Sequence, residues 1–115
     1  MSTNKINRIR QKINSAECLI NTGSYLDGAS LYWQASRDYI SYWLTAKQIN
    51  FSSTNDAIRH AIQIVDSETR EKIIQIEIIG TLSEWDEFFI ITKEQAIDFK
   101  NNCVSILNSL DYGNN

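Results

Sequence analysis

The stretch over residues 24–50 constrains the fold more than any other, because it holds half of the chain's aromatic residues at helical spacing. Two neighbouring stripes, with members three and four residues apart, share the small residues Ala29 and Ser36. The other members are Leu26, Trp33, Ile40, Trp43 and Lys47 in one stripe, and Tyr25, Tyr32, Tyr39 and Trp43 in the other. Each large ring buries roughly 150–250 Å². A helix with so wide an apolar face packs against neighbours on two sides, so this stretch predicts the central helix of a bundle.

Turn-forming residues are scarce in the rest of the chain, which contains no proline and only four glycines. A β-sandwich or barrel needs more turns than that, so helices are favoured. Helical spacing predicts a first helix over residues 4–22, with Ile6, Ile9, Ile13, Ala16 and Ile20 on its inner face. Gly23 then ends this helix and Ser24 caps the next, which predicts an antiparallel helical hairpin.

Two further helices are predicted over residues 55–65 and 67–82, the second capped by Ser67. A closing helix follows Thr92, which forms a capping-box pattern with Gln95. Its inner face is predicted to contain Ala96, Phe99, Cys103, Ile106 and Leu110. Residues 111–115 are expected to be a frayed polar tail. The fold class is therefore all-α: a single domain over residues 1–115, built as an up-and-down bundle of four to five helices.

The segment over residues 73–91 also allows a second interpretation. Isoleucines alternate with polar residues after Lys72, and residues 87–92 are rich in β-forming side chains, so the two could pair as a hairpin. A lone hairpin is marginal without more sheet. Ile74, Ile78, Thr81, Leu82 and Trp85 repeat at helical spacing, and we therefore favour a helix, followed by a loop or a short helical turn over residues 85–91.

The composition is that of an ordinary globular protein, with 43% apolar and 22% charged residues. No apolar run reaches the roughly 18 residues needed to span a bilayer, and the polar N-terminus does not resemble a secretion signal. We therefore expect a cytoplasmic protein without a membrane segment. Cys18 and Cys103 match no metal or redox spacing, so we expect two buried free thiols. A disulfide stays open as an alternative if the first and last helices touch.

Few residues of the chain could act in catalysis or bind a metal or cofactor. His60 is the only histidine, which rules out any site that needs two imidazoles, and phosphate-binding loops and nucleophile elbows are missing. We therefore predict no metal and no cofactor. Asp56 lies four residues before His60, a spacing that either orients the imidazole for acid–base work or forms a plain surface link.

Charge is unevenly distributed, with a basic start and an acidic second half. The residues before Ala16 that carry charge are all basic: Lys5, Arg8, Arg10 and Lys12. This first helix could meet phosphates, although no aromatic residues are interleaved with its basic ones. The acidic half contains the motif SEWDEFF, in which Glu84, Trp85, Asp86 and Glu87 form a candidate contact set for a basic protein. The alternative is that these aromatics plug the end of the bundle.

Residues 16–44 resemble the opening helix pair of HEPN-type domains, especially of the PaREP1-like branch. Ala16, Gly23, Ala29, Trp33 and Ala35 match positions in an alanine-rich first helix, a turn with glycine and a second helix with an aromatic residue near an alanine. Residues 82–107 resemble the late aromatic segment and closing helix of that family. The resemblance implies a HEPN-like helical bundle.

HEPN ribonucleases carry an arginine that steadies the scissile phosphate and, four to six positions later, a histidine that acts on the 2′-hydroxyl proton. The nearest match begins at Arg59 and His60, but Ile64 and Val65 stand where that histidine belongs. The resemblance therefore implies a HEPN-type domain without its catalytic histidine. We lean against an enzyme and expect no catalytic residues, with Arg59 and His60 as candidates only under the alternative.

These features favour a non-catalytic binding or regulatory protein, in the form of an antitoxin- or immunity-like protein that neutralises a toxin such as a nuclease. The alternative is a divergent HEPN-type RNA-processing, nucleotide-binding or nucleic-acid-binding domain using Arg59, His60 and Arg37, with Arg37 and Asp38 as an internal polar site. A self-associating bundle, as in a homodimer, is a third possibility, since the aromatic-rich helix has much apolar surface.

Overall fold

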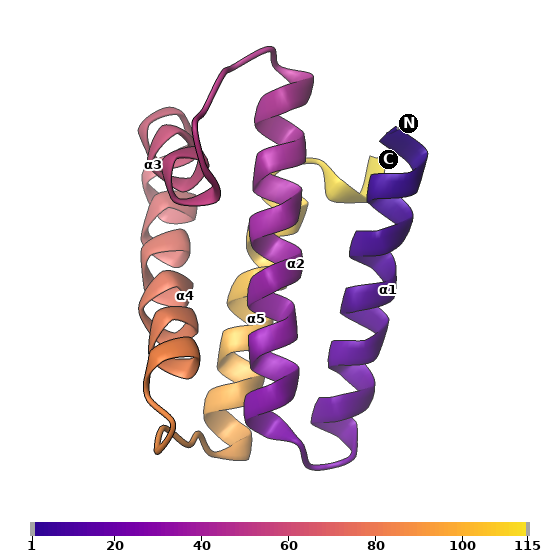
Figure 1. The fold of residues 1–115 in the computed structure, drawn as a ribbon, viewed down its shortest axis with the longest axis vertical. Helices are drawn as coiled ribbons and strands as arrows, with labels where there is room; N and C mark the ends of the chain where they lie inside the picture. The colour runs from indigo at the N-terminus through magenta and orange to yellow at the C-terminus, as the bar shows by residue number, and fades with distance from the viewer. Residues whose placement is uncertain (1, 115) are drawn as a thin grey trace.

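The computed structural model describes residues 2–114, with side chains described for residues 4–114, and its helices form an up-and-down bundle (Figure 1). They are α1 (Ser2–Asn21), α2 (Tyr25–Ala46), α3 (Thr54–Ile64), α4 (Ser67–Trp85), α5 (Lys93–Ser109) and the short 3₁₀ helix η1 (Tyr112–Asn114). The described residues contain no strand, which excludes the hairpin alternative for residues 73–91. The all-α prediction is confirmed.

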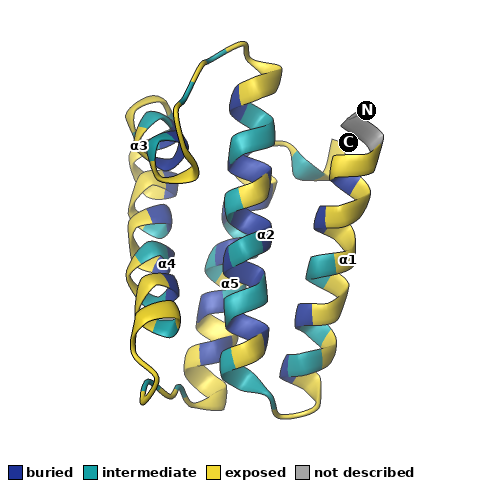
Figure 2. Ribbon diagram, in the orientation of Figure 1, coloured by how far each residue is buried: buried dark blue, intermediate teal, exposed yellow. Residues whose placement is uncertain are grey.

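Helix α2 is the centre of the bundle, as its broad apolar face predicts. It packs against α1, α3, α4 and α5, and Figure 2 shows dark buried positions along it. Tyr32, Trp33 and Tyr39 are each at most 2% exposed, and the small residues Ala29 and Ser36 are fully enclosed. Tight packing around large rings is what holds a core of this size together.

The close pairing of α1 with α2 depends on two glycines. Gly23 has φ of 93°, a left-handed conformation that ends α1 as the sequence predicts. Gly28 lies where α2 approaches α1 so closely that a Cβ would collide with the Ile20 side chain and the Ala16 carbonyl. One detail of the prediction is wrong: Ser24 is the N-cap residue of α2, but its hydroxyl makes no capping hydrogen bond.

Helix α4 differs from its prediction at both ends. Its N-cap is Asp66 and not Ser67, because the Asp66 carboxylate accepts a hydrogen bond from the Thr69 N–H at 2.7 Å. That bond lowers the pKa of Asp66 below its usual value. The helix then runs to Trp85, one turn beyond the predicted end at Leu82, before a non-helical connection over residues 86–92.

The closing helix confirms its prediction in detail. Thr92 and Gln95 form the capping box, and the five predicted inner-face residues are buried. The predicted frayed tail is wrong for residues 112–114, which form η1. The Tyr112 ring meets the Tyr39 ring edge-on, with centroids 5.1 Å apart, while the Tyr39 hydroxyl donates to the Leu110 carbonyl at 2.7 Å. Residue 115 lies outside the described part.

The two cysteines have different environments, which corrects the prediction of two buried thiols. Cys103 is enclosed beside α2, and burial raises its pKa to about 12, whereas Cys18 is exposed on α1. Both are free, so the disulfide alternative does not hold. Along residues 2–114, no helix combines the length and the apolar composition that crossing a membrane demands.

Candidate functional site

The predicted contact set lies where α4 ends and the connection to α5 begins. Trp85 is the last residue of α4 and is 83% exposed, and Phe88 in the following turn is 82% exposed. Glu84, Asp86 and Glu87 are exposed around them. The alternative, in which these aromatics plug the end of the bundle, fails for Trp85 and Phe88. Two large rings stand in solvent beside three carboxylates.

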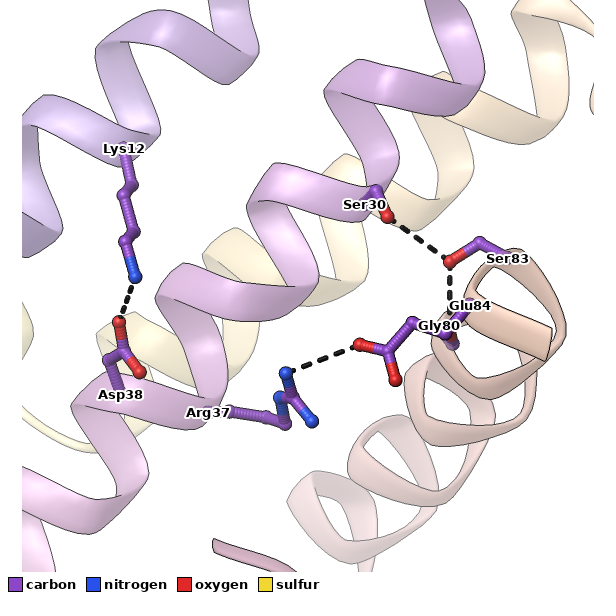
Figure 3. Close-up of polar contacts among 7 residues, drawn as sticks. All are labelled: Lys12, Ser30, Arg37, Asp38, Gly80, Ser83 and Glu84. Atoms are coloured by element: carbon purple, nitrogen blue, oxygen red, sulfur yellow. Dashed lines mark hydrogen bonds and ion pairs between the residues drawn. The ribbon is translucent and has the colours of Figure 1, made fainter.

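Glu84 is tied to the central helix. Its carboxylate lies 3.2 Å from the Arg37 guanidinium of α2 (Figure 3). That guanidinium also stacks over the Trp33 ring, 5.1 Å from its centroid. The Trp33 ring in turn packs on the backbone at Gly80, where any Cβ would collide with it. Glu84 therefore joins the end of α4 to α2 as well as contributing negative charge at the surface.

A second polar link joins α2 to the same end of α4. The Ser83 hydroxyl donates to the Gly80 carbonyl at 2.7 Å, so its oxygen accepts from the Ser30 hydroxyl at 3.2 Å (Figure 3). The links through Glu84 and Ser83 fix the last turn of α4. Trp85 is thus presented from a rigid element, which reduces the entropy that its ordering in a complex would cost.

Asp86 shapes the turn that carries Phe88. Its carboxylate accepts from the Phe88 N–H at 3.0 Å, and its carbonyl accepts from the Phe89 N–H at 3.0 Å. Phe89 folds back to half-burial while Phe88 points out. Of the three predicted acids, Glu87 alone has no hydrogen bond or ion pair within the described residues. Two of the acids therefore support the fold, and all three contribute charge.

Sequence reasoning missed that the exposed apolar surface continues along α4. Ile74, Ile78, Thr81 and Leu82 are exposed in line with Trp85, while Ile73, Ile76 and Gly80 on the opposite side are buried. Beyond the helix, Ile90 is 83% exposed. The helical repeat of the exposed residues was visible in the sequence. It did not show which face points outward, because isoleucines occur all round this helix.

The residues of the RNase alternative do not form an enclosed site. Arg59 is exposed on α3, and the His60 Nε2 lies 3.6 Å from the Asp56 carboxylate, a surface link of the predicted spacing. The backbone N–H of Ser52 donates to that carboxylate at 2.9 Å and lowers the pKa of Asp56. This arrangement holds the start of α3 in place. Within the described residues, it brings no acid–base group other than Asp56 to His60.

Arg37 and Asp38 do not make the internal polar site of that alternative. Arg37 turns toward α4, whereas Asp38 turns toward α1 and pairs with Lys12 at 2.5 Å (Figure 3). Asp38 and Lys12 lie in a groove of about 630 Å³ over α2, between α1 and the connection to α3. The basic residues Lys5 and Arg8 also line this groove, together with the half-buried ring of Phe51.

Comparisons with known protein families and with curated proteins found no match. The resemblance to HEPN-type domains therefore stays a prediction from the residues that carry it.

Proposed function

We propose that the chain is a non-catalytic protein-binding module that covers a basic partner with the end of α4 and the turn that follows. The contact set is Trp85, Glu84, Asp86 and Glu87, to which the exposed ring of Phe88 is added. One observation carries the proposal: Trp85 is 83% exposed on a helix end that two polar links fix in place. Tryptophan is among the residue types enriched at the positions that dominate binding energies at protein interfaces.

The charge around these rings indicates the kind of partner. Three carboxylates surround Trp85 and Phe88, and they attract a basic surface during encounter, while the rings supply the area that is buried afterwards. Nothing comparable favours catalysis, because His60 lies on an open helix face with a single carboxylate beside it. The proposed activity is therefore occlusion of the partner.

The specific form that we propose is an antitoxin- or immunity-like protein of the cytoplasm, in which a HEPN-type bundle without its catalytic histidine neutralises a toxin such as a nuclease. A nuclease has a basic surface because it binds phosphates. An acidic protein with exposed rings suits the occlusion of such a surface, and the net charge of −3 has the required sign.

The test is to co-express the chain with the product of the neighbouring gene and to measure association by calorimetry. We expect a complex whose affinity falls roughly a hundredfold on Trp85→Ala, the size of effect of a strong interface residue. The charge reversal Glu87→Lys should weaken binding mainly through a slower association rate. Absence of association, or a Trp85→Ala complex of unchanged affinity, would contradict the proposal.

Asn101→Ala provides a control, since Asn101 is an exposed residue on α5 and not part of the contact set. Its affinity should equal that of the unchanged protein. Far-ultraviolet circular dichroism of each variant separates loss of binding from loss of fold. Trp85 is suited to this test because its side chain is almost fully exposed and contributes little to the core.

A second function, binding of a nucleotide or of nucleic acid, is favoured by the groove over α2. Lys5, Arg8 and Lys12 line it, against one acid, Asp38, and the ring of Phe51 offers a surface for stacking. If this function holds, a labelled oligoribonucleotide should bind with an affinity that falls on Lys5→Glu. Lys93→Glu, at the start of α5, is the matched charge reversal. Equal binding by both variants would remove this candidate.

A further inference from the structure

We propose that the binding surface extends from Trp85 along the whole outer face of α4 and takes up one amphipathic helix of the partner, with an apolar stripe flanked by lysines and arginines. The outer face is defined here as Ile74, Ile78, Thr81, Leu82 and Trp85. This inference rests on the proposed function and adds to it the shape and charge of the segment that is bound.

The outer face has the geometry of a helix-docking stripe. Its residues follow one another at steps of four, three, one and three, which places them on one side of α4 along about 16 Å of its axis. That length corresponds to about three turns of a second helix. Ile78 in the middle is 57% exposed, and the opposite side of α4 already packs on α2 and α5. The stripe is therefore surplus to the core of this chain.

A hollow in the stripe provides a place for a side chain of the bound helix. It is shallow and open to solvent, and it is lined by Ile74, Glu77, Ile78, Thr81 and Leu82. Thr81 has the smallest side chain of the residues that line it. Helices pack by setting the side chains of one into such hollows of the other. A leucine or phenylalanine beside a basic residue would match the apolar walls and Glu77.

The charges around the stripe select a basic helix. Glu71 and Glu77 lie along it, and Asp86 and Glu87 follow its end. The two basic residues of α4 are engaged elsewhere: Arg70 donates to the Ile62 carbonyl, and Lys72 donates to Glu68 and Ser105. A helix bearing lysines or arginines beside its apolar stripe would pair with these acids without displacing existing contacts.

The same charges disfavour a second copy of this chain as the occupant. If two outer faces met antiparallel across a two-fold axis near Ile78, Glu71 of each copy would lie beside Trp85, Asp86 and Glu87 of the other. Glu77, close to the axis, would face its own counterpart. Like charges held opposite each other weaken association, so a self-complementary interface is not expected here.

The experiment uses two synthetic 14-residue amphipathic helices as probes, one of leucine and lysine and one with glutamate in place of every lysine. Binding is followed by calorimetry with the full chain. We expect the lysine probe to bind and the glutamate probe to bind at least about tenfold more weakly. Ile78→Glu in the stripe and Thr81→Phe in the hollow should each lower affinity for the lysine probe by about tenfold. Asn101→Glu and Asn101→Phe, on α5, are the matched controls.

The outcomes separate the helix-docking inference from the proposed function on which it rests. If the lysine probe binds equally to Ile78→Glu, Thr81→Phe and the controls, the attraction is diffuse and the helix-docking inference is wrong. If Trp85→Ala abolishes binding of the natural partner while Ile78→Glu and Thr81→Phe leave it unchanged, the proposed function survives and the inference again fails. A doubled mass by light scattering that Ile78→Glu abolishes would make a second copy the occupant and overturn the basic-helix assignment.

Discussion

Helices α2 and α4 both carry apolar residues around most of their circumference, yet only α2 is enclosed. Helix α2 packs against four other helices, and its rings are buried at Tyr32, Trp33 and Tyr39 and half-buried at Tyr25, Tyr42 and Trp43. Helix α4 packs on α2 and α5 with one side and leaves Ile74, Ile78 and Leu82 in solvent on the other. A helix that is apolar all round belongs in an interior. The proposed binding of an outside partner rests on this difference.

The two tryptophans Trp33 and Trp85 offer the largest test of this contrast. Trp33→Ala should lower the free energy of unfolding by about 3–5 kcal/mol, because it empties a fully enclosed site. Trp85→Ala should change it by less than about 0.5 kcal/mol, because that ring lies in water. Urea unfolding followed by circular dichroism measures both. Equal losses for the two variants would break the contrast between an enclosed and an open helix.

The contact between α2 and α4 provides a second test of the contrast between an enclosed and an open helix. Gly80→Ala should destabilise the protein by about 1–3 kcal/mol, because the added methyl group enters the space of the Trp33 ring and the two helices must move apart. Gly113→Ala is the control, since a Cβ there meets no atom within 4 Å. If Gly80→Ala is as stable as the control, the buried side of α4 is more loosely packed than described, and thermal unfolding would reveal it.

Much of the enclosed part could be predicted from the sequence, because spacing of three and four residues marks an inner face wherever polar residues occupy the outer one. The faces of α1 and α5 were predicted residue by residue, from Ile6 to Ile20 and from Ala96 to Leu110. For α4 this signal is lost: Ile73, Ile74, Ile76 and Ile78 point in several directions, so no single face stands out. The burial of each depends on where α2 and α5 lie.

The candidate site was predictable only in its composition. The motif around Trp85 suggested an exposed ring among acids, which agrees with the exposure of Trp85. The pairing of Glu84 with Arg37 joins residues 47 positions apart, and no local pattern indicates it. The exposure of Cys18 was missed for a related reason, because a small side chain beside an inner face can lie on either side of its boundary.

A smaller effect tests how α4 begins. Asp66→Ala should cost about 1 kcal/mol, because it removes the carboxylate that accepts the Thr69 N–H. Ser24→Ala, at the start of α2, should cost less, because the Ser24 hydroxyl makes no capping hydrogen bond. We therefore expect the start of α2 to be stabilised by its contacts with other helices, and the start of α4 partly by its own cap. Chemical denaturation of the two variants checks this, and a larger loss for Ser24→Ala would reverse the order.

The smallest expected effect concerns the partly buried contacts of Glu17, which link α1 to α2 and α5. The Tyr32 hydroxyl of α2 donates to the Glu17 carboxylate at 2.7 Å, and Lys100 of α5 pairs with the same carboxylate. The hydrogen bonds from Lys100 and Tyr32 lower the pKa of Glu17 below its ordinary value of 4.5. Because the folded state holds this proton less tightly than the unfolded chain, the carboxylate contributes full stability above that value and loses it as the pH falls through the folded pKa.

The pH dependence of the stability of Glu17→Gln therefore tests whether the contacts of Glu17 with Tyr32 and Lys100 form in solution. The unfolding free energy of the unchanged protein should exceed that of Glu17→Gln at neutral pH, and the difference should narrow as the pH falls below about 4.5. Lys100→Met should remove part of the same dependence, because Tyr32 is left as the one remaining donor of the pair. A difference that stays constant between neutral pH and pH 3 would mean that Glu17 does not bind Tyr32 and Lys100 in solution. The enclosure of α2 would then rest on its apolar contacts alone, and its contrast with α4 would be one of packing only.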